Sequence, residues 1–277
     1  MQMDTELEQN KNVDLQLKGA HGNAAYNLTD KVSQNVGNTL ANLWYLVFGG
    51  ISEKAEEKKM RLGIKLQQYQ SELQQAYSNV PEENRQDAPL QVVGPALEKS
   101  RYCVESDEIR KMFVNLIAKS MDKTYNTKVH PSFPEIISQM SPLDAQNLKL
   151  IYEAKYQLPI AKYRFNLVKE GSHKDVKPLV FLSNPEVQSV DLQASSITVL
   201  SRLGLLEVTF DEYVSESNAY DAFQTDPLLL AFKNMVPTEP EYGYQSPEDD
   251  DKIKECIMMK GLVRITPIGK DFASVCI

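Results

Sequence analysis

A run of capped, regularly spaced apolar residues between positions 106 and 154 constrains the fold of this chain more than any other stretch. Ser106, followed by Asp107 and Glu108, is typical of a helix start, because serine accepts a backbone N–H and acids suit the positive end of the helix dipole. The apolar residues that follow share one helical face: Ile109, Met112, Phe113, Leu116, Ile117 and Met121. The spacing predicts an amphipathic helix packed against other helices.

Two further helix starts follow closely. The His-Pro pair at 130–131 breaks the chain, and Pro134 suits the first turn of a short helix. Ser141 is a typical N-cap, with Pro142 at the first helical position and Asp144 at the third. This succession of starts and breaks predicts an α-helical region.

Two runs in this region resemble the core of the Abi-alpha family, a domain of unknown function in bacteria and mobile elements: EIRKMFVNLIAKSMD (108–122) and VHPSFPEIISQMSPLDAQNLKLI (129–151). The family pattern is a helix similar to LFxNLLAxSMD, matched here by Met112–Asp122, and then HPSFxEIIxQLSPxEA, matched by His130–Ala145. Weaker similarity extends to PALEKSRYC and to GLVRITPIGKDFA. The resemblance implies a role in phage defence by abortive infection.

Charge and cysteine content narrow the class of protein. The chain has 30 Lys and Arg against 38 Asp and Glu, a net charge of −8, whereas a general nucleic-acid binder usually has a basic excess. Cys103, Cys256 and Cys276 are far apart and form no CxxC pair, which favours a reducing compartment over a disulfide framework. The N-terminal sequence is acidic and polar, unlike a secretory signal peptide. We therefore expect a cytoplasmic protein, with membrane association left open.

Residues 1–28 show no sustained period and are interpreted as a mobile leader, after which a helical pattern begins at Thr29. Residues 40–48, LANLWYLVF, are almost continuously apolar, but a membrane span needs about 20 such residues. We favour a helix packed deep in a bundle or dimer. The alternative is a surface for a membrane or a protein partner, formed by Leu40, Leu43, Trp44 and Phe48.

The next segment steps by four and three residues, as in a coiled-coil seam. The seam consists of Leu62, Leu66, Tyr69, Leu73, Ala76 and Val80. It is shorter than the about three to four heptads expected of an independent coiled coil, which favours a long bundle helix. A homo-oligomer through Leu62, Leu66, Tyr69 and Leu73 is the alternative. Residues 29–140 are thus predicted to form one helical, bundle-like domain.

The pattern changes after Met140, and residues 141–277 are predicted to form a winged-helix-like α+β domain. A turn is expected at GSHKD (171–175), strands at LVFL (179–182), LLEVTF (205–210) and GLVRIT (261–266), and helices at 192–203 and 270–276. Gly204 would end the first of these helices, and Pro267-Ile268-Gly269 would form a turn. This order is similar to winged-helix domains, so the predicted fold class is mainly α with a small β component.

An acidic insertion, residues 211–252, separates the two strands of the predicted wing. Such a segment is either a partially ordered loop, which we favour, or a regulatory flap. Within it, PLLLAFKNMV (227–236) has the composition of a short helix.

The sequence contains no recognised catalytic, cofactor or metal pattern. His21, His130 and His173 do not pair at helical spacing, and GxxxxGK[ST], GxGxxG and GxSxG are absent. A pairing of Cys103 with His130 is conceivable, but buried structural cysteine is commoner. We therefore expect a non-enzymatic protein without a metal or cofactor.

His130 and Glu135 form the candidate polar interaction site. They could present an imidazole and a carboxylate to a partner or ligand. Alternatively, a histidine before proline sets an extended turn, with its ring capping the next helix, and we favour this structural interpretation.

DNA binding is the main alternative function. The candidate recognition helix at 191–203 carries one basic residue, Arg202, and the wing adds Lys260, Arg264 and Lys270 beside the acidic insertion. This composition favours protein partners over DNA. The first hypothesis is a defence-associated protein of the abortive-infection type that acts through protein partners, including a phage component, and near the membrane. The second is a winged-helix DNA-binding regulator of a defence or toxin–antitoxin-like locus.

Overall fold

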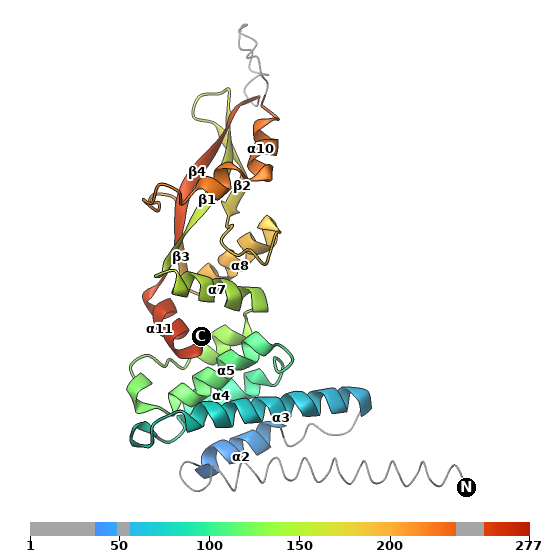
Figure 1. Cartoon of the computed structure of the whole chain (residues 1–277), viewed down its shortest axis with the longest axis vertical. Coiled ribbons are helices and arrows are strands. Elements are labelled where there is room, and N and C mark those ends of the chain that lie inside the picture. The colour runs from blue at the N-terminus through green and yellow to red at the C-terminus, as the bar shows by residue number, and fades with distance from the viewer. Residues whose placement is uncertain (1–36, 49–55, 237–251) are drawn as a thin grey trace, which may run out of the picture. The chain divides into compact units, whose positions relative to one another are not determined.

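The structure is a computed structural model that describes residues 37–48, 56–236 and 252–277 (Figure 1). It divides into two compact units, one ending at Gln139 and including Ser274–Ile277, the other Met140–Ala273. The predicted domain boundary after Met140 lies one residue from this division. The predicted leader, 1–28, lies outside the described residues. Helices dominate and the described strands form one sheet, so the prediction of a mainly α fold with a small β component is confirmed.

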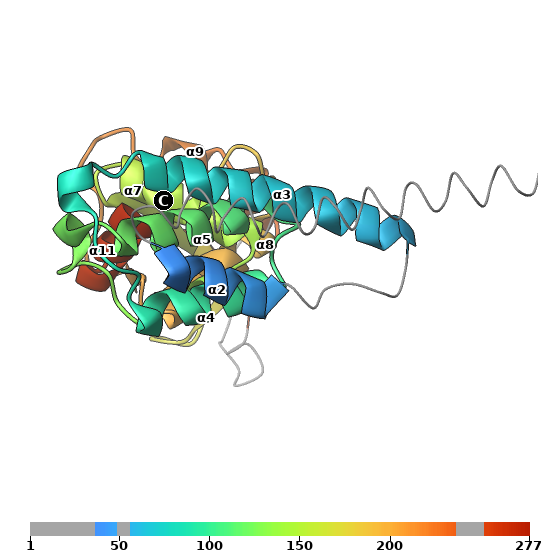
Figure 2. The ribbon, with the colours of Figure 1, turned by 90° about the horizontal axis from the view of Figure 1, so that it is seen from below.

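The first unit is helical. Its described elements are α2 (Gly37–Phe48), α3 (Glu56–Ser78), α4 (Leu90–Ser100), α5 (Asp107–Ser120) and α6 (Phe133–Ser138), with the 3-10 turns η1 (Glu82–Asn84) and η2 (Lys123–Tyr125). Helix α5 packs against α3, α4 and α6, and Figure 2 shows α3 and α4 on its two sides. The predicted apolar face of α5 is confirmed, because Phe113, Leu116 and Ile117 are fully buried. This face forms the core of the first unit.

Local sequence signals set several helix ends as predicted. The Ser106 side chain accepts a hydrogen bond from the Ile109 backbone N–H at the start of α5. Ser141 and Asp144 form a reciprocal capping box at the start of α7 (Pro142–Glu153). Helix α4 was not predicted. Its Pro95 lies inside the helix, where proline normally argues against helical structure.

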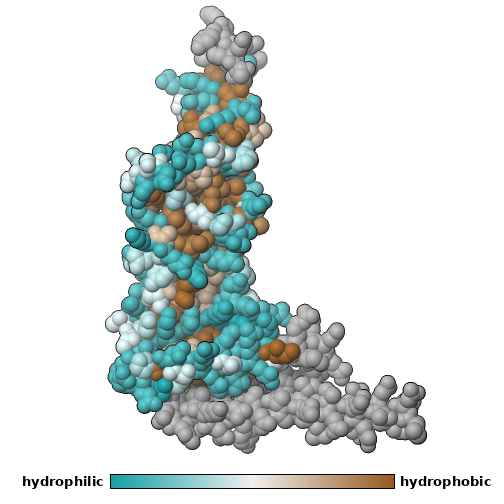
Figure 3. All heavy atoms as spheres, viewed as in Figure 1, coloured by the Kyte–Doolittle hydropathy of each residue, from teal (hydrophilic) through white to brown (hydrophobic). Residues whose placement is uncertain are grey.

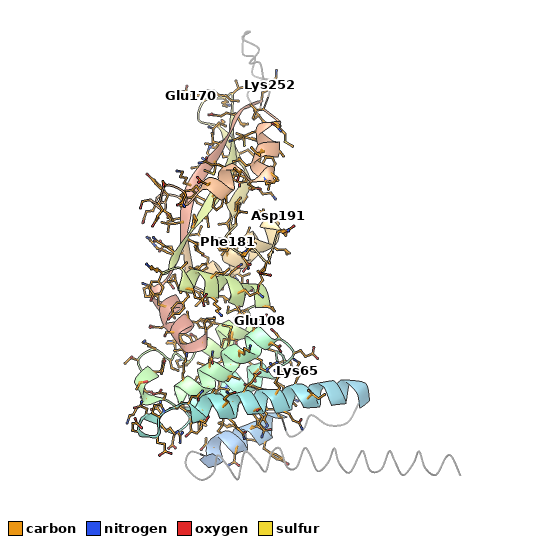
Figure 4. All side chains as sticks on the ribbon, in the orientation of Figure 1. Lys65, Glu108, Glu170, Phe181, Asp191 and Lys252 are labelled. Atoms are coloured by element: carbon orange, nitrogen blue, oxygen red, sulfur yellow. The ribbon has the colours of Figure 1, made fainter. Side chains whose placement is uncertain are left out.

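The second unit is built around a four-stranded antiparallel sheet. The strands are β1 (Gln157–Leu167), β2 (His173–Val180), β3 (Leu206–Thr209) and β4 (Ile253–Ile265), in the spatial order β2-β1-β4-β3. The helices are α7, α8 (Val190–Arg202), α9 (Asp221–Gln224), α10 (Pro227–Lys233) and α11 (Pro267–Cys276). Figure 4 shows Glu170, in the β1–β2 turn, and Lys252 at the same end of the sheet, where the Lys252 carbonyl accepts a bond from the Val168 N–H at 2.9 Å.

This sheet is larger than the predicted wing. Strand β1 was not predicted, and β4 begins at Ile253 instead of Gly261 because it pairs with β1 along nearly its whole length. Strand β2 begins at His173, so the turn predicted at 171–175 is wrong for residues 173–175. The strand predicted at 179–182 overlaps only the end of β2. These pairings join segments that are distant in the sequence, so the residues of each strand alone give little indication of its position.

The predictions of strand β3, helix α8 and the helix end at Gly204 are confirmed. Strand β3 and helix α8 lie where expected, and Gly204 follows α8 with φ of 77°, the left-handed conformation that glycine adopts without strain. The turn predicted at Pro267–Gly269 is wrong, because these residues form the first turn of α11. Whether the unit is a winged helix stays a prediction.

The described part of the acidic insertion, 211–236, belongs to the folded core. Tyr220, Phe223 and Leu229 are buried against the sheet together with Tyr163 and Phe165. The helix predicted in PLLLAFKNMV is confirmed as α10. The favoured interpretation of a partially ordered loop is therefore wrong for 211–236, while residues 237–251 lie outside the described part.

The visible faces of the two units differ in hydropathy. Hydrophilic residues cover most of the visible face of the first unit, and hydrophobic areas are larger on the visible face of the second (Figure 3). Sheets with one solvated face commonly show such areas between polar residues.

Candidate functional site

An open groove of about 430 Å³ lies in the first unit, where the loop before α4 meets the segments that follow α5. One side of the groove is lined by residues from segment 86–92, and the other by Ser120, Asn126, Val129 and Pro131. The second side belongs to the stretch with the family resemblance. Loops held by rigid elements commonly carry binding residues, so this groove is the candidate functional site.

Paired amides hold the two sides of the groove together. The Gln86 side-chain nitrogen donates to the Ser120 carbonyl at 2.8 Å and to Asn126 Oδ1 at 2.6 Å. Asn126 Nδ2 donates back to Gln86 Oε1 at 3.0 Å. The Gln86 backbone N–H also donates to the Met121 carbonyl at 2.9 Å. These bonds preform the groove and use most of the hydrogen-bonding capacity of Gln86 and Asn126.

Arg85 anchors the same loop on the side of α3. Its Nε donates to the Val80 carbonyl at 3.0 Å, and its guanidinium carbon lies 5.0 Å from the centre of the Tyr77 ring. Arg85 also forms an isolated β-bridge with Asp122, whose carboxylate accepts from the Thr124 N–H at 2.9 Å. The guanidinium is thus engaged by its own loop and by α3.

The His130 ring bonds to Ser132, the residue that precedes α6. Its Nδ1 accepts from the Ser132 backbone N–H at 3.2 Å and lies 2.7 Å from the Ser132 hydroxyl, which donates when Nδ1 is unprotonated. Glu135 instead pairs with Lys99 at 2.7 Å, and this ammonium lowers the pKa of the Glu135 carboxyl. The two predicted site residues therefore have separate partners, and the His130 ring makes a local contact with Ser132 without a capping bond to α6.

The apolar segment in α2 forms part of the core. Leu40, Trp44 and Phe48 are buried, Leu43 is half-buried, and the Trp44 ring lies 5.2 Å from that of Tyr69. The candidate membrane or partner surface is thus wrong as a surface, because these rings pack against α3. The exposed apolar residues of α2 are instead Tyr45 and Leu46. No helix among the described residues combines the length and apolar character needed to span a membrane.

The proposed oligomer contact has a similar outcome. Tyr69 and Leu73 are fully buried inside the first unit, and Leu66 is half-buried. The side chain of Leu62 lies outside the described residues. The seam therefore packs within its own unit, as expected of a bundle helix, and its buried members are unavailable to a second copy.

The predicted DNA contacts are mostly engaged within the second unit. Arg264 makes two hydrogen bonds to Glu207, at 2.9 and 3.0 Å, and one to Glu212 at 3.0 Å, and these acids raise its pKa. The Lys260 ammonium lies 5.0 Å from the centre of the Tyr220 ring, and that of Lys270 lies 4.6 Å from the Tyr156 ring. Arg202 is exposed in the last turn of α8.

Sequence reasoning missed the most buried charged residue. Arg110 in α5 is fully buried, and makes two hydrogen bonds to Glu72 in α3, at 2.9 and 3.0 Å. It also donates to Asp107 at 2.8 Å, and Asp107 accepts from Lys65 at 2.9 Å (Lys65 is labelled in Figure 4). Hydrogen bonds from Lys65 and Arg110 lower the Asp107 pKa to about 2. The spacing of three between Asp107 and Arg110 was the only local signal of this network.

No reactive cysteine or metal cluster emerges from the described segments. Burial raises the pKa of the Cys103 thiol, which favours the protonated, unreactive form. Across 37–48, 56–236 and 252–277, no group of three or more His, Cys, Asp or Glu side chains is arranged to hold a metal ion.

The matched family covers both units. The model of the family described as "Abortive infection alpha" matches residues 61–276, and the chain therefore belongs to the Abi_alpha family, as the sequence resemblance implied. A comparison with curated proteins finds no match.

One solved structure shows a weak likeness. It is that of an uncharacterized protein from the hydrocarbon-degrading marine bacterium Alcanivorax borkumensis SK2, with 11% identity and a TM-score of 0.33, covering 55% of this chain and 94% of that one. A likeness at this level carries no argument about function.

Proposed function

We propose that this chain is a defence-associated protein that acts in abortive infection by binding a protein partner through its first unit. The observation that carries the proposal is the match to the "Abortive infection alpha" family over residues 61–276. The match includes every segment that lines the groove, so the candidate site lies inside the family region.

Two features of the groove support a protein as its ligand. Leu90 is 59% exposed at the rim, and large exposed apolar side chains beside a preformed hollow are typical of protein contacts. The groove is also open, so a partner segment can enter without a change in the loops that Gln86 and Arg85 hold.

The DNA-binding alternative has less support. Phosphate contacts would need positive charge on the predicted wing, yet the Arg264 guanidinium already bonds to Glu207 and Glu212. Breaking these pairs would offset the gain from a phosphate contact.

The test is the plating efficiency of a phage panel on bacteria that express the chain, compared with cells carrying the empty vector. We expect fewer plaques for at least one phage, together with early collapse of the infected culture. Equal plaque counts for every phage, at confirmed expression of folded protein, would contradict the defence role.

A groove variant locates the activity. Leu90→Asp should abolish protection with little loss of stability, because Leu90 is exposed and an acid in the first turn of α4 suits the helix dipole. The matched control is Leu192→Asp, an equally exposed leucine in the first turn of α8. Protection that survives Leu90→Asp would show that the partner binds elsewhere.

A further inference from the structure

We infer that the groove of the first unit binds an arginine side chain that is followed by an apolar residue in an extended segment of a partner protein. This inference rests on the proposed function, because it names the chemistry of the partner at the same site. It follows from which groups in the groove are already satisfied and which are left to bind.

Asp87 is the charged residue of the groove. It is the one ionisable residue among those that line the groove, and it is exposed. Within the described residues it makes no hydrogen bond or ion pair, whereas Gln86 and Asn126 bond to each other. A carboxylate at the edge of a preformed hollow is best complemented by a cation.

The charges around Asp87 add to this preference. The loop 81–89 also carries Glu82 and Glu83, and its one base, Arg85, stacks on Tyr77 and lies 3.7 Å from Glu82. On the facing segment, neither Lys123 nor Lys128 lines the groove, and the Lys128 ammonium lies 5.8 Å from the centre of the Tyr125 ring. The groove therefore disfavours an acidic segment.

The residues that line the groove favour arginine over lysine. A guanidinium is planar and can donate two parallel hydrogen bonds to a carboxylate while its face contacts apolar groups. Pro89 and Pro131 supply apolar surface in the groove, and the exposed side-chain amide of Gln91 can accept from a remaining N–H. A lysine ammonium is more strongly hydrated and makes less use of such surfaces.

Leu90 accounts for the apolar neighbour. Leu90 is 59% exposed, and the half-buried Val129 lines the same groove. The volume of about 430 Å³ lies within the range of about 300–1,000 Å³ for small-ligand pockets, which suits one or two side chains. An extended segment with an arginine and a following leucine fits both the charge and this size.

The experiment titrates the full-length protein with capped tetrapeptides and follows backbone amide resonances by NMR. The probe is acetyl-Ala-Arg-Leu-Ala-amide, and the comparison peptides carry Glu or Lys in place of Arg, or Ser in place of Leu. We expect shifts confined to residues 86–92 and 120–131, with the Arg-Leu peptide binding most tightly. The absence of localised shifts at the highest soluble peptide concentration would overturn the inference.

Two matched variants test the carboxylate. Asp87→Asn should weaken binding of the Arg-Leu peptide about three- to fivefold, the range of an exposed ion pair. Glu83→Gln removes the same charge in the same loop but outside the lining of the groove. It should change binding less than about twofold, because solvent and salt screen a charge that does not contact the peptide. Equal effects of the two variants, or equal binding of the Glu peptide, would contradict the inference.

A further variant tests the contact between Leu90 and the leucine of the peptide. Leu90→Ser should weaken the Arg-Leu peptide but leave the Arg-Ser peptide unchanged, and equal weakening of both would refute a specific apolar contact. Peptide binding without phage protection would remove the proposed function and leave this inference standing. Protection without peptide binding would leave the proposed function standing and overturn this inference.

Discussion

The two units differ in the buried polar contacts that join their helices. The first unit buries a charge, because the Arg110 guanidinium lies between Glu72 and Asp107 and joins α5 to α3. The second unit buries neutral amides, in which Asn184 donates to Asn147 at 2.8 Å and Asn147 donates to Ser196 at 3.0 Å.

The difference has consequences for stability. A buried guanidinium is costly unless each of its donors is paired, so its network fails when one partner is lost. Neutral amides have a smaller desolvation cost and do not titrate. The α3–α5 contact should thus respond to pH and to charge substitutions, whereas the amide contact between α7 and α8 should not.

Arg110→Met should produce the largest effect. Removing the guanidinium leaves the Val104 carbonyl without this donor and Glu72 without its ion pair, although Glu72 still accepts from Gln68. The expected cost is about 3–5 kcal/mol in the free energy of unfolding. Trp44, the one tryptophan of the chain, is buried against Tyr69 and supplies a fluorescence signal for the first unit during urea denaturation.

Its control is Lys111→Met, on the exposed neighbour, which should change stability by less than about 0.5 kcal/mol. The double variant Arg110→Met with Glu72→Met should recover part of the loss, because neither charge is then left alone. A loss below about 1 kcal/mol for Arg110→Met would show that the charge is not buried as described.

Asn147→Ala should have the next largest effect. The change leaves Asn184 Nδ2 and Ser196 Oγ without their partners inside the second unit, and should cost about 2–3 kcal/mol. Amide hydrogen exchange in α7 and α8 measures it, with the exposed Lys149→Ala as control. A cost that changes between pH 5 and pH 8 would contradict the neutral character of this network.

Tyr163→Phe tests an intermediate case, in which a neutral hydroxyl bonds to a carboxylate. The Tyr163 hydroxyl donates to Asp226 Oδ2 at 2.6 Å, and Asp226 also caps α10 by accepting from the Leu228 N–H. Losing the hydroxyl should cost about 1–2 kcal/mol and speed amide exchange in α10. Tyr213→Phe, at an exposed ring, is the control and should leave exchange in α10 unchanged.

The smallest effect concerns pH. The pKa of Asp107 is about 2 in the fold against an ordinary value of 3.8, so its contribution is present above about pH 4 and is lost as the pH falls towards 2. Asp107→Asn should therefore reduce the free energy of unfolding at pH 7, and the difference from the unaltered protein should shrink below pH 4. A difference that is constant from pH 7 to pH 2.5 would rule out this titration.

Local signals predicted the helix starts well. The side chains of Ser106 and Ser141 bond within their own first turns, so a few adjacent residues determine each start. Gly204 was predictable for the same reason, because a left-handed residue after a helix favours glycine.

Contacts between distant segments were not predictable. Strand β1 depends on pairing with β4, from Gln157 with Arg264 to Leu167 with Ile253, and its own sequence showed no clear strand pattern. The buried position of Arg110 depends on Glu72, and a charged residue in an amphipathic helix is ordinarily assigned to solvent.

The candidate site has the same limitation. Sequence reasoning selected His130 for its chemistry, but the groove depends on Gln86 and Asn126, which meet only after folding. Pro131, the neighbour of His130, lines the groove, whereas His130 itself does not.

The outermost strand β2 limits how this protein can assemble. Pro178 lies in β2 and has no N–H to offer a further strand, and the strand also carries Lys174 and Lys177. Chains with such edges resist stacking into extended aggregates even when concentrated. High expression should therefore leave this sheet at four strands, without growth into fibres along β2.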